Sequence, residues 1–210
     1  MKPDADLAAC RAAHATLLEL ISGLTDSGAQ AASCLAGWSV GHVLTHLARN
    51  ADANRGVAEG AAAGEVRPMY ASMQSRNDDI EAGAGRAAAE LVADVRTSVA
   101  ALEAAWDALD ENTWAQGRGQ SPFGELPLAE TVWRRAREVS VHSGDLGAVF
   151  DPSVLSEAYL AADLPRLLAD LPARIDLDGR RRLHAWLLGR GGPPALDLAP
   201  WAGPPPSPPR

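Results

Sequence analysis

Apolar side chains recur every three or four residues along four long segments of the chain, a spacing that places them on one face of a helix. Ser39 is a natural N-cap for the second segment, and Pro127 suits the first turn of the fourth. The predicted helices span residues 4–24, 40–59, 87–109 and 127–147. Four amphipathic helices within about 150 residues predict a mainly α fold, a four-helix bundle.

The segments between these helices have no sustained period. Residues 61–86 contain glycine, proline and scattered charges, which predicts a long connection with a helical turn near 70–76. Residues 113–125 are rich in glycine and polar residues and predict turns.

The chain beyond residue 150 predicts a small α/β appendage. A helix is expected over 155–171, interrupted near Pro165, and another ends at Leu188. Residues 173–177 alternate like a half-exposed strand, and 196–198 would form a second one. The expected organisation is a bundle over 1–150, a small α/β domain over 151–198 and a disordered proline-rich tail over 199–210.

Composition narrows the classes of function. The chain has 210 residues and a net charge of −8, and this acidity argues against a surface for nucleic acid or anionic membrane. No segment approaches the ~18 uninterrupted apolar residues of a membrane span, and the N-terminus is unlike a signal peptide. Cys10 and Cys34 make no disulfide framework, which favours a reducing cytoplasm and small packed side chains rather than nucleophiles.

The strongest candidate chemistry lies in the fourth predicted helix. Glu138, His142 and Asp145 follow one another at spacings of four and three residues, which places them on one helix face. Such groups need a compensating partner when they are buried, and a divalent metal would satisfy all of them. The alternative is a buried hydrogen bond between Glu138 and His142 without a metal.

The second predicted helix carries His42 and His46, four residues apart, so either or both could face a shared ion. Val43 stands where the metalloprotease H-E-x-x-H motif has its glutamate, which excludes that motif. Facing helices of a bundle often share a metal, and two histidines with one glutamate leave a coordination position open, as in catalytic zinc sites. His14 lies on the apolar face of the first helix, so we expect it to be a partly buried histidine of the core.

Three segments carry a resemblance to a known family: Gly37–Asp52, Arg137–Leu146 and Leu183–Gly191. The first two resemble the mycothiol-dependent maleylpyruvate isomerase family, which belongs to the wider DinB-like metal-binding bundles. The third is similar to the signature of that family's second domain. The resemblance covers nearly the whole chain apart from its loops and its proline-rich end.

The resemblance implies a zinc ion, or another divalent metal, held by His46, Glu138 and His142. It selects His46 over His42, which would instead pack beside the site or support a ligand. Ser143 stands where relatives often carry another histidine, a departure that affects the surroundings of the metal more than its ligands.

Two further residues gain roles from the resemblance. Asp145 matches a recurring acidic position and would orient a ligand imidazole or a bound substrate; its alternative role is to cap the helix end. Arg190 matches the Gly-Arg of the C-terminal signature and would bind a substrate carboxylate through its guanidinium. The alternative for Arg190 is a solvated arginine at a helix C-terminus.

The implied reaction is a cis-trans isomerisation in gentisate degradation. Rotation about the double bond of maleylpyruvate requires that bond to become single, and addition of a thiolate achieves this. The adduct rotates and expels the thiol, which leaves fumarylpyruvate. Because the chain offers no convincing nucleophilic cysteine, the thiol is external, and mycothiol is the family's thiol. The implied partners are therefore a low-molecular-weight thiol and a small dicarboxylate substrate.

Two other functions fit the same residues. A mycothiol S-transferase would keep the metal ligands and use the same thiolate on another electrophile, without needing Arg190. A noncatalytic metal-binding bundle would use the cluster of histidine and glutamate for structure alone.

Overall fold

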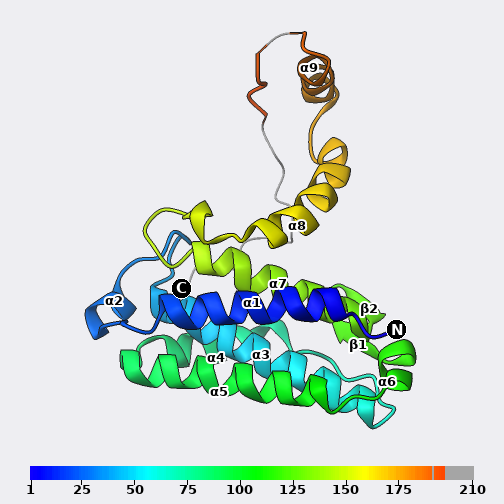
Figure 1. The fold of residues 1–210 in the computed structure, drawn as a ribbon. Helices are drawn as coiled ribbons and strands as arrows, with labels where there is room; N and C mark the ends of the chain where they lie inside the picture. The colour runs from blue at the N-terminus through cyan, green and yellow to red at the C-terminus, as the bar shows by residue number, and fades with distance from the viewer. Residues whose placement is uncertain (191, 197–210) are drawn as a thin grey trace. The chain divides into compact units, whose positions relative to one another are not determined.

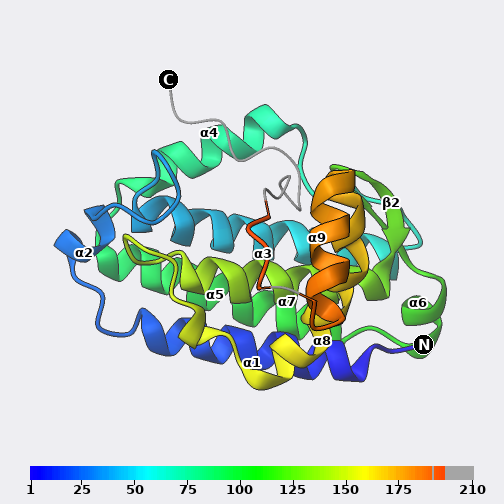
Figure 2. The same ribbon diagram turned by 90° about the horizontal axis from the view of Figure 1, so that it is seen from above.

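Four long helices form the body of the protein, whose computed structural model describes residues 1–190 and 192–196. These are α1 (Asp4–Leu20), α3 (Val40–Ala62), α5 (Ala88–Asp107) and α7 (Leu128–Gly144). Helix α1 contacts α5 and α7, and α3 contacts the same two helices from the other side (Figures 1 and 2). The predicted mainly α four-helix bundle is confirmed.

The bundle core is built from the apolar faces that the sequence pattern indicated. Val43, Leu44 and Leu47 of α3 are fully buried among residues of α1, α5 and α7. The predicted N-cap of α3 is confirmed, because Ser39 Oγ accepts the backbone N–H of His42. The His42 ring returns a bond, since its Nδ1 accepts the backbone N–H of Ser39 at 3.1 Å.

Two short elements occupy segments in which the sequence predicted only connections and turns. Helix α4 (Met73–Ala84) lies within the long connection and packs on α3, and Ser72 caps it. Strands β1 (Arg118–Ser121) and β2 (Gly124–Pro127) pair as an antiparallel hairpin before α7. The remaining short elements of the first 156 residues are α2 (Asp26–Gln30), α6 (Glu111–Gln116) and the 3-10 turn η1 (Pro152–Val154).

The chain divides into two compact units, Met1–Ser156 and a second unit that begins at Glu157. The second unit contains α8 (Glu157–Asp170), the 3-10 turn η2 (Leu171–Ala173) and α9 (Leu177–Leu187). Pro165 lies inside α8, so the predicted interruption of that helix is wrong.

The strand predicted over 173–177 is also wrong. The side chain of Asp176 accepts the backbone N–H of Gly179 at 2.6 Å, so Asp176 caps α9 and its successors form a helical turn. Ile175 is buried, which explains the apolar position that resembled strand alternation. The second predicted strand falls largely on residues 197 and 198, and these lie outside the described residues together with the proline-rich tail.

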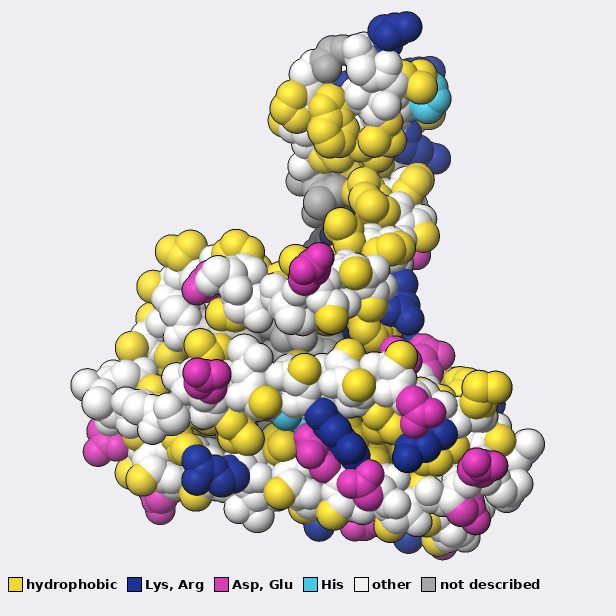
Figure 3. Space-filling model, in the orientation of Figure 1, with side chains coloured by type: hydrophobic (Ala, Val, Ile, Leu, Met, Phe, Trp, Pro, Cys, Tyr) yellow, Lys and Arg dark blue, Asp and Glu magenta, His cyan; other side chains and the backbone are white. Residues whose placement is uncertain are grey.

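The surface carries charges of both signs. On the face shown in Figure 3, basic and acidic side chains are interspersed over α1 and α5. Arg11 of α1, for example, pairs with Asp107 of α5 at 2.6 Å. Within the described residues, no helix has both the length and the apolar character needed to cross a bilayer.

We expect Gly41→Ala to destabilise the bundle by about 1–3 kcal/mol, because a new side chain has no room there. A Cβ at Gly41 would collide with the backbone carbonyl oxygen of Ala84, where the end of α4 crosses α3. Gly56→Ala is the matched control, since a Cβ at that position of the same helix meets nothing within 4 Å. This substitution should stabilise the protein by about 0.5–1 kcal/mol. Urea unfolding measures both, and equal effects would contradict the close crossing of α3 and α4.

Candidate metal centre

Side chains from α3 and α7 converge at one site within the bundle. His46 Nε2 lies 3.0 Å from Glu138 Oε2, and His142 Nε2 lies 3.5 Å from the same oxygen. The two imidazole rings meet edge to face with their centroids 4.9 Å apart. The potential ligand atoms of all three residues lie within 4.8 Å of one another. The structure thus brings together the three residues that the sequence analysis named as ligands.

The other histidine of α3 has different partners. His42 Nδ1 is bound to the cap residue Ser39, and its Nε2 lies 3.3 Å from Glu81 Oε2 of α4. Its ring stacks on Trp38 at a centroid distance of 6.1 Å. His42 therefore supports the start of α3 beside the site and is not part of the cluster with Glu138.

Asp145 links the end of α7 to the loop that precedes α3. Its Oδ2 accepts a hydrogen bond from His142 Nδ1 at 2.7 Å, and its Oδ1 accepts one from the Cys34 thiol at 2.8 Å. The backbone N–H of Cys34 also donates to the Asp145 carbonyl. These bonds fix the orientation of the His142 ring and leave its Nε2 facing Glu138.

The buried charges perturb each ionisable group at the site. Burial opposes ionisation of Glu138, but hydrogen bonds from His142 and His46 outweigh it and hold the pKa of Glu138 well below its usual value. Burial lowers the pKa of His46 to about 4, although its bond to Glu138 acts in the opposite direction. For His142, burial is outweighed by the bonds to Asp145 and Glu138, which raise its pKa to about 9. The carboxylate of Glu138 is therefore ionised and held between two imidazoles.

The thiol nearest the site, that of Cys34, is bound to Asp145. Burial and the hydrogen bond to Asp145 raise the pKa of Cys34 to about 12, so it stays protonated at neutral pH. Burial likewise raises the pKa of Cys10 to about 12. Neither cysteine of the chain therefore offers a thiolate at neutral pH.

Two residues at the site were missed by the sequence analysis. Arg76 of α4 places its Nη2 3.1 Å from His46 Nδ1, on the side of the ring away from Glu138. The guanidinium of Arg76 also lies over the ring of Tyr70 at 5.8 Å, and Asn50 of α3 donates to the Tyr70 hydroxyl. Both residues fall where the sequence indicated only a helical turn in a long connection, so their proximity to His46 had no local signal.

The donor set fits a divalent metal of the zinc type. Two imidazole nitrogens and one carboxylate oxygen are ligands that zinc takes, and three protein ligands leave a position for a thiol or water. Two residues of the set, His46 and Glu138, come from different long helices of a rigid bundle, so their relative position does not depend on a flexible loop. Metal binding would displace the proton of His142, so it should be coupled to pH.

Arg190 belongs to the second unit, after the end of α9. Its backbone N–H donates to the carbonyl of Ala185, and its guanidinium donates to the carbonyl of Leu188 at 3.3 Å. The side chain is exposed and makes no ion pair among the described residues of its unit.

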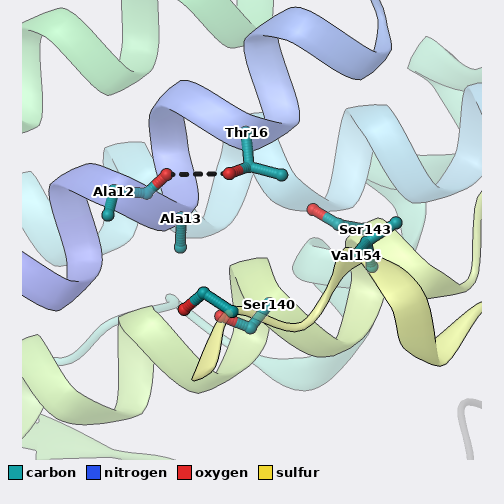
Figure 4. Close-up of a pocket in the computed structure, with 7 residues that line it drawn as sticks. Ala12, Ala13, Thr16, Ser140, Ser143 and Val154 are labelled. Carbon is teal, nitrogen blue, oxygen red and sulfur yellow. Dashed lines mark hydrogen bonds between the residues drawn. The ribbon is translucent and has the colours of Figure 1, made fainter. Parts of the chain in front are cut away.

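A small cavity lies between α1 and α7 and is bounded by η1 (Figure 4). Its volume is about 10 Å³, room for about one water molecule. The lining side chains are small, and Thr16 Oγ1 already donates to the carbonyl of Ala12. This cavity is too small for an organic substrate.

Residues 10–147, which include the whole cluster, match the family model described as the mycothiol maleylpyruvate isomerase N-terminal domain. The chain belongs to this family. Two solved structures are similar to it, those of the mycothiol-dependent maleylpyruvate isomerase and of a histidine-to-alanine mutant of that enzyme, at 31% and 30% sequence identity. Each match has a TM-score of 0.71 and covers 77% of this chain and 67% of the other. A search of curated protein sequences gave no match.

Membership of the mycothiol maleylpyruvate isomerase family agrees with the resemblance seen in the sequence. The matched region contains the three predicted ligands and Asp145, whereas Arg190 lies beyond it. The likeness to the family therefore covers the bundle and its metal-type cluster.

Proposed function

We propose that this protein is a mycothiol-dependent maleylpyruvate isomerase that converts maleylpyruvate to fumarylpyruvate by addition of the thiol, bond rotation and elimination. The observation that carries the proposal is the convergence of His46, Glu138 and His142 in a chain of this family. A zinc ion held by these residues would lower the pKa of a coordinated thiol and so supply a thiolate at neutral pH.

The chain's own residues would hold and orient the reacting partners. Glu138 contributes the negative charge that a cation needs, because its carboxylate stays ionised between the two imidazoles. Asp145 fixes the orientation of His142 through the bond to Nδ1. The buried ring of Trp38 meets the His46 ring edge to face, with the two centroids 5.8 Å apart. We further propose that Arg190 binds a carboxylate of the substrate.

The proposal is tested with zinc-loaded protein and maleylpyruvate, assayed with mycothiol, with glutathione and with no thiol. We expect formation of fumarylpyruvate with mycothiol, without net consumption of the thiol. Consumption of mycothiol with other electrophiles, and no isomerisation, would identify an S-transferase instead. A protein that binds zinc but shows neither activity would be a noncatalytic bundle.

Arg190→Ala should retain zinc but lose most of the turnover, because the substrate would lack a bidentate partner for a carboxylate. Arg182→Ala is the matched control, since Arg182 is an exposed arginine of α9 in the same unit and pairs with Asp178. The metal content and the steady-state rate of isomerisation are measured for both variants. Unchanged turnover in Arg190→Ala would remove Arg190 from the proposed site.

A further inference from the structure

Arg76 is a guanidinium without a carboxylate partner at the edge of the metal-type cluster. Among the described residues, its contacts are an imidazole nitrogen of His46, the side-chain oxygen of Asn77, and both the ring and the hydroxyl of Tyr70. None of these groups is negatively charged. Two other arginines near α3 differ in this respect, because Arg49 and Arg86 both pair with Asp94, at 2.5 and 2.7 Å. The charge of Arg76 is thus available to an anion.

The bond between Arg76 and His46 fixes the position of the imidazole proton. A guanidinium can only donate, so His46 Nδ1 accepts from Arg76, and the proton of the neutral ring lies on Nε2. This Nε2–H faces Glu138 Oε2 at 3.0 Å, the oxygen that His142 also approaches. The Nε2 side of His46 is therefore the side that faces the other two potential ligands.

A cation bound at Nε2 is incompatible with this bond. The metal needs the lone pair of Nε2, so the proton of a neutral imidazole must lie on Nδ1. The Nδ1–H group and the guanidinium would then be two donors facing each other. His46 can hold Arg76 or a metal, but it cannot hold both in this arrangement.

We propose that Arg76 binds a carboxylate of the dicarboxylate substrate, and that His46 holds its guanidinium until a cation on the other side of the imidazole releases it. The inference rests on the proposed function for the identity of the anion. It adds to the site a carboxylate-binding residue from the first unit, independent of Arg190.

The surroundings keep a released Arg76 close to the cluster. Tyr70 provides an aromatic face for the guanidinium, and its own position is fixed by the 3.2 Å bond from Asn50. Asn77 Oδ1 accepts from Nη1 at 2.9 Å. The Nη2 group that now bonds His46 would be the one that becomes free, and a planar guanidinium can present two parallel donors to a carboxylate.

The first measurement is zinc affinity in the absence of substrate. Arg76→Met removes the competing bond and the positive charge, so it should bind zinc about threefold to tenfold more tightly. Arg134→Met is the control, because Arg134 pairs with Glu130 on the exposed face of α7 and loses the same charge. It should bind zinc like the unmodified protein. An unchanged or weaker zinc affinity in Arg76→Met would overturn the proposed exchange at His46.

The second measurement is calorimetric binding of maleate, a cis-dicarboxylate, to the zinc-loaded proteins without thiol. Arg76→Met should bind maleate roughly tenfold to a hundredfold more weakly, and Arg134→Met should bind it normally. Arg76→Lys keeps the charge without the paired donors and should recover only part of the affinity. Equal maleate affinity in Arg76→Met and the unmodified protein would refute a role in carboxylate binding.

Turnover separates this inference from the proposed function. If the unmodified protein isomerises maleylpyruvate but Arg76→Met keeps the same KM, only the role of Arg76 fails. If maleate binding depends on Arg76 but the unmodified protein does not isomerise maleylpyruvate, Arg76 stands as an anion-binding residue and the proposed function fails. Circular dichroism of each variant verifies that the bundle is folded.

Discussion

Replacement of His46 or His142 by alanine should strip the metal from the protein and reduce mycothiol-dependent isomerisation to the background rate. Each substitution removes one of three potential ligands, and the remaining two cannot close a three-ligand site. Loss of a residue that only supports a ligand costs roughly 10–100-fold in metal affinity, so loss of a ligand should cost more. Metal content after dialysis and the rate with added zinc measure the effect. The helices should remain folded, because neither substitution removes a residue of the apolar core.

His42→Ala is the control for this experiment. His42 lies one turn before His46 on the same helix, but its ring bonds Ser39 and Glu81. The variant should lose some stability at the start of α3 and keep its metal. Full metal content in His46→Ala, together with metal loss in His42→Ala, would show that the two histidines have been assigned the wrong way round.

Asp145→Asn should give an effect on metal binding between those of the ligand variants and the control. The amide keeps the shape of the side chain, but it cannot hold the His142 ring through a charged oxygen 2.7 Å from Nδ1. We expect an intermediate loss of metal affinity, about 10–100-fold. A loss as large as that of His142→Ala would make Asp145 more than an orienting residue.

The main helices could be predicted because each has a continuous apolar face. In α3 and α5 this face supplies most of the core, so the period of three and four is visible in the sequence. Helix α4 was missed because only Ile80 and Ala84 of its residues are buried, which is too few for a period to be seen. The hairpin was missed because its strands are only four residues long and include glycine.

Sequence spacing alone could not choose between His42 and His46. Both fall at a spacing that lets them share an ion, and the resemblance to the family selected His46. The structure supplies a physical reason for the difference, since His42 is the third residue of α3 and its ring is used in the reciprocal cap with Ser39. His46 lies one turn further along, opposite Glu138 of α7.

The contacts around the cluster depend on tertiary packing and could not be predicted. Arg76 lies 30 residues from His46 in the chain, and it reaches the ring only because α4 packs on α3. Cys34 contacts Asp145 across 111 residues. Neither pair leaves a pattern in the local sequence. The sequence could therefore indicate the metal ligands but not the residues that contact them.

The metal-free protein should become less stable by about 3 kcal/mol through His14 alone as the pH falls from neutral to about 4. His14 is 1% exposed, and its two ring nitrogens bond Glu103 of α5 at 2.7 Å and Arg135 of α7 at 3.2 Å. Burial lowers the pKa of His14 to about 4, although the bond to Glu103 opposes this, and the charge of Arg135 lowers it further. In the unfolded chain the imidazole has its ordinary pKa of 6.5.

The sign of the effect follows from which state takes up the proton first. Between pH 6.5 and about 4, His14 is protonated in the unfolded chain but neutral in the folded one, so acid favours unfolding. His14→Gln should remove this part of the pH dependence, because an amide can still donate to Glu103 and accept from Arg135 but does not ionise. Urea unfolding at a series of pH values measures the difference in slope between the two proteins.

Cys10→Ala is the matched control for His14→Gln. The Cys10 thiol lies 3.8 Å from the same ring, but its pKa is raised to about 12, so it does not change charge in acid. Its replacement disturbs the same packing and should leave the slope unchanged. The other groups that titrate in acid, including the metal-free cluster around Glu138, are present in all three proteins. Their contributions to the pH dependence of stability therefore cancel in the comparison. A slope in His14→Gln equal to that of the unmodified protein would mean that folded His14 accepts a proton as readily as the unfolded chain. The folded protein would then hold two positive charges side by side, the imidazolium of His14 and the buried guanidinium of Arg135.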